Sequence, residues 1–174
     1  KAKATLGSFP TSCDIAVSGN IIKNAKSVVV PHTGGMKGIE TAVVAGLVGG
    51  NPDARLEGLS SVTDTDISRM HEVIGKLPVT VRLSESDYPF DILVTVTDGE
   101  NNASVRVTNR HTNIVSITRN GEAIFTGEIT ESIEVKKKDL SIEEIVEFAN
   151  TVDIELVKPT LKRQIDCNMA IAEA

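Results

Sequence analysis

The sequence predicts an α+β protein in which an antiparallel sheet, a meander, packs against helices. Three observations support this class. Between residues 79 and 129, apolar and polar residues alternate with a period of two, which is typical of strands with one buried face. Before and after that region, apolar residues recur at helical spacing. The 174 residues, 40% of them hydrophobic, are enough to bury a sizeable core, so we expect a single domain over residues 1–174.

The first thirty residues predict a helix end and two strands. KAKATLG resembles the last turns of a helix, and Gly7 ends it. CDIAVS, residues 13–18, is expected to be a strand, followed by a polar turn at residues 19–20. SVVV, residues 27–30, is expected to be a second strand because it is apolar and β-branched and is followed by a proline.

Two helices are expected next. A glycine turn at residues 34–35 leads into MKGIETAVVAGLV, whose apolar residues have helical spacing and which a glycine pair at residues 49–50 ends. A second helix is expected to begin between Thr63 and Asp66 and to continue through ISRMHEVIGKL to residue 77.

The alternating region predicts the antiparallel meander, with one face on the core. Hairpin turns are indicated at residues 98–102 and at the Asn-Gly pair 120–121. The following run VKKKD, residues 135–139, is expected to be a solvated loop. The strands are expected at residues 79–85, 91–99, 103–110 and 113–121, with an extension over 122–129.

The last third is predicted to be helical. Ser141 and Glu144 form a capping box in front of one helix, and Asp153 caps a longer one in which Pro159 lies in an early turn. That helix continues to residue 174 without a stop signal. We therefore expect the chain to be part of a longer protein at both ends.

Composition argues against two classes of partner. The formal net charge is −6 and aromatic residues make up 3%, with no Trp, so neither an electrostatic footprint nor a stacking platform for nucleic acid is present. No apolar run approaches the roughly 20 residues of a membrane span. Cys13 and Cys167 form no CxxC pair; we expect two reduced thiols in a cytoplasmic protein, with one long-range disulfide as the alternative.

The turn Thr33-Gly34-Gly35 is the first candidate site. At a helix start, such a turn would present unpaired backbone N–H groups to a carboxylate or phosphate. The alternative is a helix start that Thr33 caps, with the glycines serving close packing. Neither GxxxxGK[ST] nor GxGxxG, the glycine patterns of nucleotide-binding loops, is present. Further donors would come from Asn20, Lys23 and Asn24.

The second candidate is NRHTNI, residues 109–114, which lies between two expected strands. His111 could act as a base near neutral pH or orient a substrate carboxylate. The alternative is a loop histidine whose neighbours satisfy turn hydrogen bonds. His32 adjoins the glycine turn and could line the same pocket, whereas His71 is expected on a helix surface.

Taken together, SGNIIKNAKSVVVPHTGGMKGIETAVVAGLVGG, HTNI and IEEIVEFANTVDIELVKPTLKRQIDCNMAIAEA resemble successive segments of the cysteine desulfidase family. That family is similar to the α-chain of iron–sulfur L-serine dehydratases. The resemblance spans nearly the whole chain in the right order, is strongest over residues 14–50, and is weakest through the meander.

The resemblance implies a lyase of amino-acid catabolism. It implies β-elimination from L-cysteine or L-serine to pyruvate and ammonia, with an oxygen-sensitive [4Fe–4S] cluster as Lewis acid and no pyridoxal phosphate. His111 would be the catalytic base or an orienting group. The small amino-acid substrate would be bound by Ser18, Asn20, Lys23, Asn24, Thr33, Gly34, Gly35, Thr112 and Asn113.

The chain departs from the family pattern at both ends. An Ala-Leu-Gly-Cys-Thr-Glu-Pro-like segment and further cluster cysteines are absent, so no metal ligand is assigned here, and the cluster is expected in the full-length parent. We expect the N-terminal portion of a lyase, inactive alone, with the C-terminal remainder of the parent as its partner. The alternatives are a non-catalytic domain that binds an anionic metabolite and an assembly domain, in which the chain forms a homo-oligomer.

Overall fold

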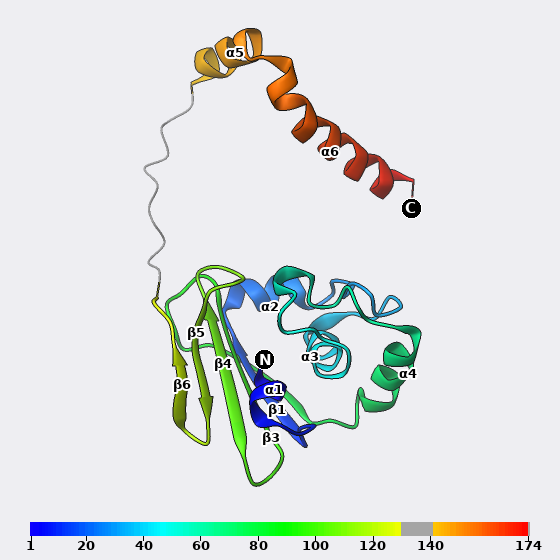
Figure 1. Ribbon diagram of the computed structural model, residues 1–174, viewed down its shortest axis with the longest axis vertical. Helices are drawn as coiled ribbons and strands as arrows, with labels where there is room; N and C mark the ends of the chain where they lie inside the picture. Colours follow the sequence, from blue (N-terminus) through cyan, green and yellow to red (C-terminus); the bar gives the residue numbers. More distant parts are fainter. Residues whose placement is uncertain (130–140, 174) are drawn as a thin grey trace. The chain divides into compact units, whose positions relative to one another are not determined.

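The computed structural model describes residues 1–129 and 141–173, which belong to two compact units, Lys1–Ser132 and Ile133–Ala174 (Figure 1). Among the described residues, the first unit contains a six-stranded sheet and four α-helices, and the second contains two helices. The mixed α+β class predicted from the sequence is confirmed. A single domain over residues 1–174 stays a prediction, and the expected loop VKKKD lies outside the described residues.

In the first unit, the elements follow one another in a mixed order of helices and strands. In chain order they are α1 (Ala2–Leu6), β1 (Ser12–Val17), α2 (Gly19–Ala25), α3 (Gly38–Val48), the 3-10 turn η1 (Arg55–Glu57), α4 (Asp64–Val73), β2 (Val79–Leu83), β3 (Asp91–Thr97), β4 (Asn102–Thr108), β5 (Ile114–Arg119) and β6 (Glu122–Thr126).

The sheet has the order β2-β1-β3-β4-β5-β6. Strands β3 to β6 form the predicted antiparallel meander, and Asn120 and Gly121 make its last turn with φ of 52° and 82°. The expectation that residues 79–85 begin the meander was wrong. Strand β2 is an edge strand parallel to β1, and β1 lies between β2 and β3. The reason is burial, since β1 is mostly buried and needs neighbours on both sides, whereas β2 is largely exposed.

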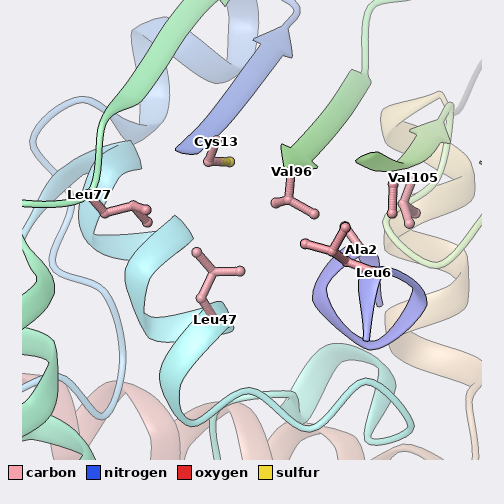
Figure 2. Close-up of a cluster of buried hydrophobic side chains, with 8 residues drawn as sticks. Ala2, Leu6, Cys13, Leu47, Leu77, Val96 and Val105 are labelled. Atoms are coloured by element: carbon pink, nitrogen blue, oxygen red, sulfur yellow. The ribbon is translucent and has the colours of Figure 1, made fainter. Parts of the chain in front are cut away.

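Helices α1 to α4 lie on one side of this sheet (Figure 1). Figure 2 shows Ala2 and Leu6 of α1 packed toward Val96, with Leu47 of α3 near Leu77. Burial of such aliphatic side chains contributes about 1.5–3 kcal/mol each. A second buried cluster joins α3 and α4 through Val44 and Met70, both fully buried.

The opposite face of the sheet is polar. Ser104 of β4 and Thr118 of β5 share a hydrogen bond of 2.7 Å, and Arg82 Nε of β2 donates to Asp14 Oδ1 of β1 at 2.8 Å. This division explains the period of two in the sequence, because alternate residues of each strand face the helices and the polar side.

Two predictions for residues 18–30 were wrong. Residues 19–25 form helix α2 rather than a polar turn, because Ile21 and Ala25, one helical turn apart, face the apolar side of the sheet. Residues 27–30 contribute one isolated bridge, Val29 to Lys37, rather than a strand; Val29 is 46% exposed. The helix expected in MKGIETAVVAGLV is confirmed as α3, which begins at Gly38 and ends at Val48.

Helix α4 has the predicted start, with Thr63 and Asp66 in a capping box, but it ends at Val73 instead of residue 77. Gly75 with φ of 75° leads the chain away from the helix.

The second unit consists of α5 (Ile142–Thr151) and α6 (Ile154–Ala172). The predicted capping box of Ser141 and Glu144 is confirmed, as is the Asp153 cap, whose Oδ1 accepts from Glu155 N at 3.0 Å. Within the described part of the chain, no helix has the length and apolar character needed to cross a membrane.

Candidate functional site

The segment between β2 and β3 contacts three of the residues predicted to form the site. Ser18 Oγ, at the end of β1, donates to the Pro89 carbonyl at 3.0 Å. Asn20 Nδ2, in the first turn of α2, reaches the same carbonyl at 3.4 Å. The His111 ring lies against the Phe90 ring, with centroids 4.5 Å apart. The structure therefore brings Ser18, Asn20 and His111 to one short stretch of backbone.

Asp91 anchors that stretch. It is fully buried, and its carboxylate accepts from Arg106 Nε at 2.9 Å, Arg106 Nη2 at 3.1 Å and Ser86 Oγ at 2.6 Å, and from the Ser84 hydroxyl. Burial alone would raise the pKa of Asp91, but the hydrogen bonds from Arg106 and the serines outweigh it and hold the pKa below its ordinary value. The carboxylate is thus ionised and fixes both ends of the segment.

Sequence reasoning missed this network. Asp91 is the first residue of one expected strand and Arg106 lies within the next, and the sequence analysis assigns neither residue a partner. The available signal was an aspartate at the start of an apolar strand, a position where burial requires a cationic partner.

The turn that contains His111 is held by hydrogen bonds within itself and to the segment before β3. Asn109, with φ of 63°, donates its N–H to the Phe90 carbonyl at 2.9 Å. Asn113 Nδ2 donates to the Thr108 carbonyl at 3.2 Å, so this predicted binding residue closes the turn. His111 and Thr112 are exposed at its tip and are the members of HTNI that a ligand can reach.

Three neighbouring cavities lie on the helical side of the sheet, and one of them is lined by this turn. An apolar cavity of about 340 Å³ lies between the strands and α1, α2 and α3. A second, of about 630 Å³, is lined by His111, Thr112 and Arg55. A third, of about 960 Å³, is lined by His32 and again by Arg55. His32 and His111 therefore face neighbouring spaces that share Arg55.

The turn Thr33-Gly34-Gly35 is not the helix start that the sequence predicted. Thr33 is fully buried, and its hydroxyl donates to the Val30 carbonyl at 2.7 Å. The glycines have φ of 67° and 89°, which other residues rarely adopt, so the turn itself explains them. Because α3 begins three residues later, its N–H groups and this turn do not form one anion site.

Lys23 and Asn24 are also separate from the histidine turn. Both are exposed on α2, whereas Ile21 and Ala25 of the same helix line the apolar cavity. No described contact joins Lys23 or Asn24 to His111 or to the segment before β3.

The thiols of this chain do not fit an iron–sulfur cluster, which takes three or four thiolates. Cys13 is buried in the core, where burial, with a smaller contribution from Asp14, raises the pKa of its thiol to about 11. Cys167 is free and exposed on α6, in the other unit. Among the described residues, no group of three or more His, Cys, Asp or Glu side chains could hold a metal ion.

Comparison with known proteins gives relatives of greater length. No protein-family model and no solved structure matches the chain. The chain is similar to a UPF0597 protein of Desulfitobacterium hafniense, with 41% identity over 177 residues that cover 100% of this chain and 41% of the relative. A UPF0597 protein of Finegoldia magna is 41% identical over 176 residues, covering 99% and 42%, and one of Lachnoclostridium phytofermentans is 39% identical over 175 residues, covering 99% and 42%. The chain thus spans about two fifths of these relatives.

Proposed function

We propose that this chain is the N-terminal, substrate-binding part of an iron–sulfur-dependent lyase of amino-acid catabolism in the cytoplasm. The lyase would act on L-cysteine or L-serine and release pyruvate and ammonia. The observation that supports this proposal is the convergence of Ser18, Asn20 and His111 on residues 89–90, beside cavities that an amino acid could enter.

The chemistry required is a β-elimination. A base removes the α-proton, the electrons form a carbon–carbon double bond, and the β-substituent leaves as thiolate or hydroxide. The resulting enamine becomes an imine, which water hydrolyses to pyruvate and ammonia. In this proposal the exposed His111 imidazole accepts the α-proton, because it lies on the wall of the 630 Å³ cavity with its ring fixed against Phe90.

Thr112 lines the same cavity and would donate a hydrogen bond to the substrate. Ser18 and Asn20 would act indirectly, since both hold the Pro89 carbonyl and so position the Phe90 ring behind His111. Ligands of the cluster would belong to another part of the parent polypeptide, because the donor set of this chain does not fit one. No step assigned to His111 or Thr112 depends on it.

The test is an anaerobic assay of the full-length polypeptide that contains this sequence, with sulfide and pyruvate measured from L-cysteine. His111→Ala should lower kcat by roughly 100-fold or more if the imidazole is the base. His71→Ala changes an exposed histidine of α4 that lines none of these cavities; it is the matched control and should keep wild-type kinetics. A reconstituted polypeptide with no iron–sulfur absorbance and no product would refute the lyase.

A second candidate is an assembly domain. It is favoured by apolar side chains exposed on α5 and α6, among them Phe148 at 59%, Leu156 at 77% and Ile165 at 61%. Exposed apolar surface of this kind marks interaction sites. Sedimentation of the chain over a range of concentrations tests it: a concentration-dependent mass that Leu156→Glu abolishes supports homo-oligomer formation, and a constant monomer mass refutes it.

A further inference from the structure

We infer that Arg55 binds the carboxylate of the small amino acid that the proposed lyase takes as substrate. This inference rests on the proposed function, and it assigns to Arg55 the role that the sequence assigned to Thr33-Gly34-Gly35. The reassignment is needed because the Thr33 hydroxyl is committed to the Val30 carbonyl and the turn is not a helix start.

The position of Arg55 is the first argument. It lines both the cavity that contains His111 and Thr112 and the neighbouring cavity that contains His32. A carboxylate held by Arg55 would leave the rest of the amino acid in the space that His111 also lines. Binding group and base would then face the same molecule.

The charges of the site are the second argument. Lys1 also lines these cavities, but its Nζ is paired with Asp53 Oδ1 at 2.9 Å. Asp53 and Glu57 each lie two residues from Arg55 in the chain, and Lys1 neutralises Asp53. Within the described residues, Arg55 has no hydrogen-bond or ion-pair partner for its guanidinium. The planar guanidinium can therefore offer two parallel N–H groups to a carboxylate.

The backbone is the third argument. Arg55 has φ of 50°, a left-handed conformation that is uncommon for a residue with a side chain. Hydrogen bonds within the loop hold it there: Asn51 N donates to the Gly58 carbonyl at 2.8 Å, and Glu57 N donates to the Ala54 carbonyl at 2.9 Å. His32, which lines the cavity of about 960 Å³ together with Arg55, also has a left-handed conformation, with φ of 58°. Unfavourable conformations that surrounding structure maintains are concentrated at binding sites.

The apolar lining of the cavity is the fourth argument. The cavity of about 630 Å³ is lined by aliphatic side chains as well as by polar groups. The aliphatic side chains are Val105, Val107 and Ile114. Small-molecule sites commonly combine such apolar walls with a few polar groups that fix the orientation of the ligand. The site thus fits a small α-amino carboxylate, with the Arg55 guanidinium as its cationic partner.

The experiment is a titration of the full 174-residue chain followed by amide NMR, which measures weak binding without turnover. The probes are L-serine and L-serinamide, which differ only in the carboxylate. We expect saturable shifts with L-serine in the loop around Arg55 and in the HTNI turn, and at least about tenfold weaker binding of L-serinamide. Arg55→Ala should weaken L-serine binding by about tenfold or more, and Arg55→Lys should lie between it and the wild type.

Arg119→Ala is the matched control, since Arg119 is exposed on β5 and outside the residues that line these cavities. It should bind L-serine as the wild type does. Equal binding of serine and serinamide, wild-type affinity in Arg55→Ala, or no saturable shift in the wild type would each overturn the inference. The proposed function is tested separately. If the full-length polypeptide turns over L-cysteine and Arg55→Ala leaves KM unchanged, the lyase proposal stands and the role of Arg55 is refuted. If binding depends on Arg55 but the full-length polypeptide shows no turnover, the lyase proposal is refuted and the binding role of Arg55 stands.

Discussion

Replacing the buried carboxylate of Asp91 by an amide should unfold the sheet domain more easily and should also disturb the site. Asp91→Asn keeps the shape of the side chain but removes the charge that Arg106 and two serine hydroxyls contact. One amide oxygen cannot accept all these hydrogen bonds, and the amide N–H groups would face donors. The substitution therefore leaves buried polar groups without suitable partners.

The magnitude follows from burial. Removing one partner of a fully buried ion pair costs about 3–5 kcal/mol, but the Arg106 side chain is 33% exposed and can recover some hydration. We therefore expect the free energy of unfolding to fall by about 2–4 kcal/mol in Asp91→Asn. For a unit of this size that corresponds to a decrease in Tm of roughly 6–12 °C.

The pH dependence has a definite sign. The folded-state pKa of Asp91 is lowered, so the folded protein releases this proton at a lower pH than the unfolded chain does. The stability that Asp91 contributes is fully present above the unfolded pKa of about 4 and is lost as the pH falls through the folded pKa. The difference in unfolding free energy between wild type and Asp91→Asn should be constant near neutral pH and should shrink below about pH 4.

Urea denaturation of the full chain, followed by circular dichroism at several pH values, measures this difference. Asp87→Asn, an exposed carboxylate in the same segment, is the control and should change stability by less than about 0.5 kcal/mol. Equal stability of Asp91→Asn and wild type at pH 7, or a difference that does not change toward acid, would refute the reasoning. Changes in the NMR shifts of Phe90 and His111 in Asp91→Asn would show that the loss of the Asp91 carboxylate also displaces these two side chains.

Three further predictions concern the rest of the first unit and the thiols. Met70→Ala should lower the free energy of unfolding by about 2–5 kcal/mol in urea denaturation, because Met70 is fully buried between α3 and α4. Gly38→Ala should destabilise by about 1 kcal/mol or more, since φ is 90° and the added Cβ would lie 3.3 Å from a backbone carbonyl oxygen; Gly46→Ala, in open space within α3, should instead stabilise by about 0.5–1 kcal/mol. Alkylation at pH 8 followed by mass spectrometry should modify Cys167 in the native protein and Cys13 only after denaturation, because Cys13 is buried with a raised thiol pKa; equal labelling would contradict its burial.

Elements whose signals lie within a few residues could be predicted from the sequence. The capping boxes that begin at Thr63 and Ser141 place donor and acceptor three residues apart, so the pattern contains the whole interaction. The same holds for the Asn120-Gly121 turn and the alternation that defines β3 to β6. Local information was sufficient for these elements.

Features that depend on distant partners could not be predicted. The Asp91–Arg106 pair depends on the pairing of β3 with β4. The edge position of β2 depends on β1, which precedes it by more than sixty residues. The ion pair that joins these two strands, Arg82 with Asp14, spans 68 positions of the sequence. Helix α2 was missed because Gly19 and Asn20 favour turns in isolation, and only packing of Ile21 against the sheet outweighs that preference. The candidate site shares this limit: His111 was found from its motif, whereas Arg55 is marked by cavity position and backbone conformation.

The interior place of β1, between β2 and β3, has a consequence for how the protein folds. Its register partners Val79 and Val96 are far downstream of Cys13, so a chain emerging from the ribosome must leave β1 unpaired until at least β2 has been synthesised, and without its second neighbour until β3 follows. Hairpins of β3 to β6, by contrast, have low contact order and can form locally. We expect pulsed hydrogen exchange during refolding to protect amides of β4 and β5 before those of β1. The strand that holds Ser18 at its end would then dock late, so that the site is assembled only as folding is completed.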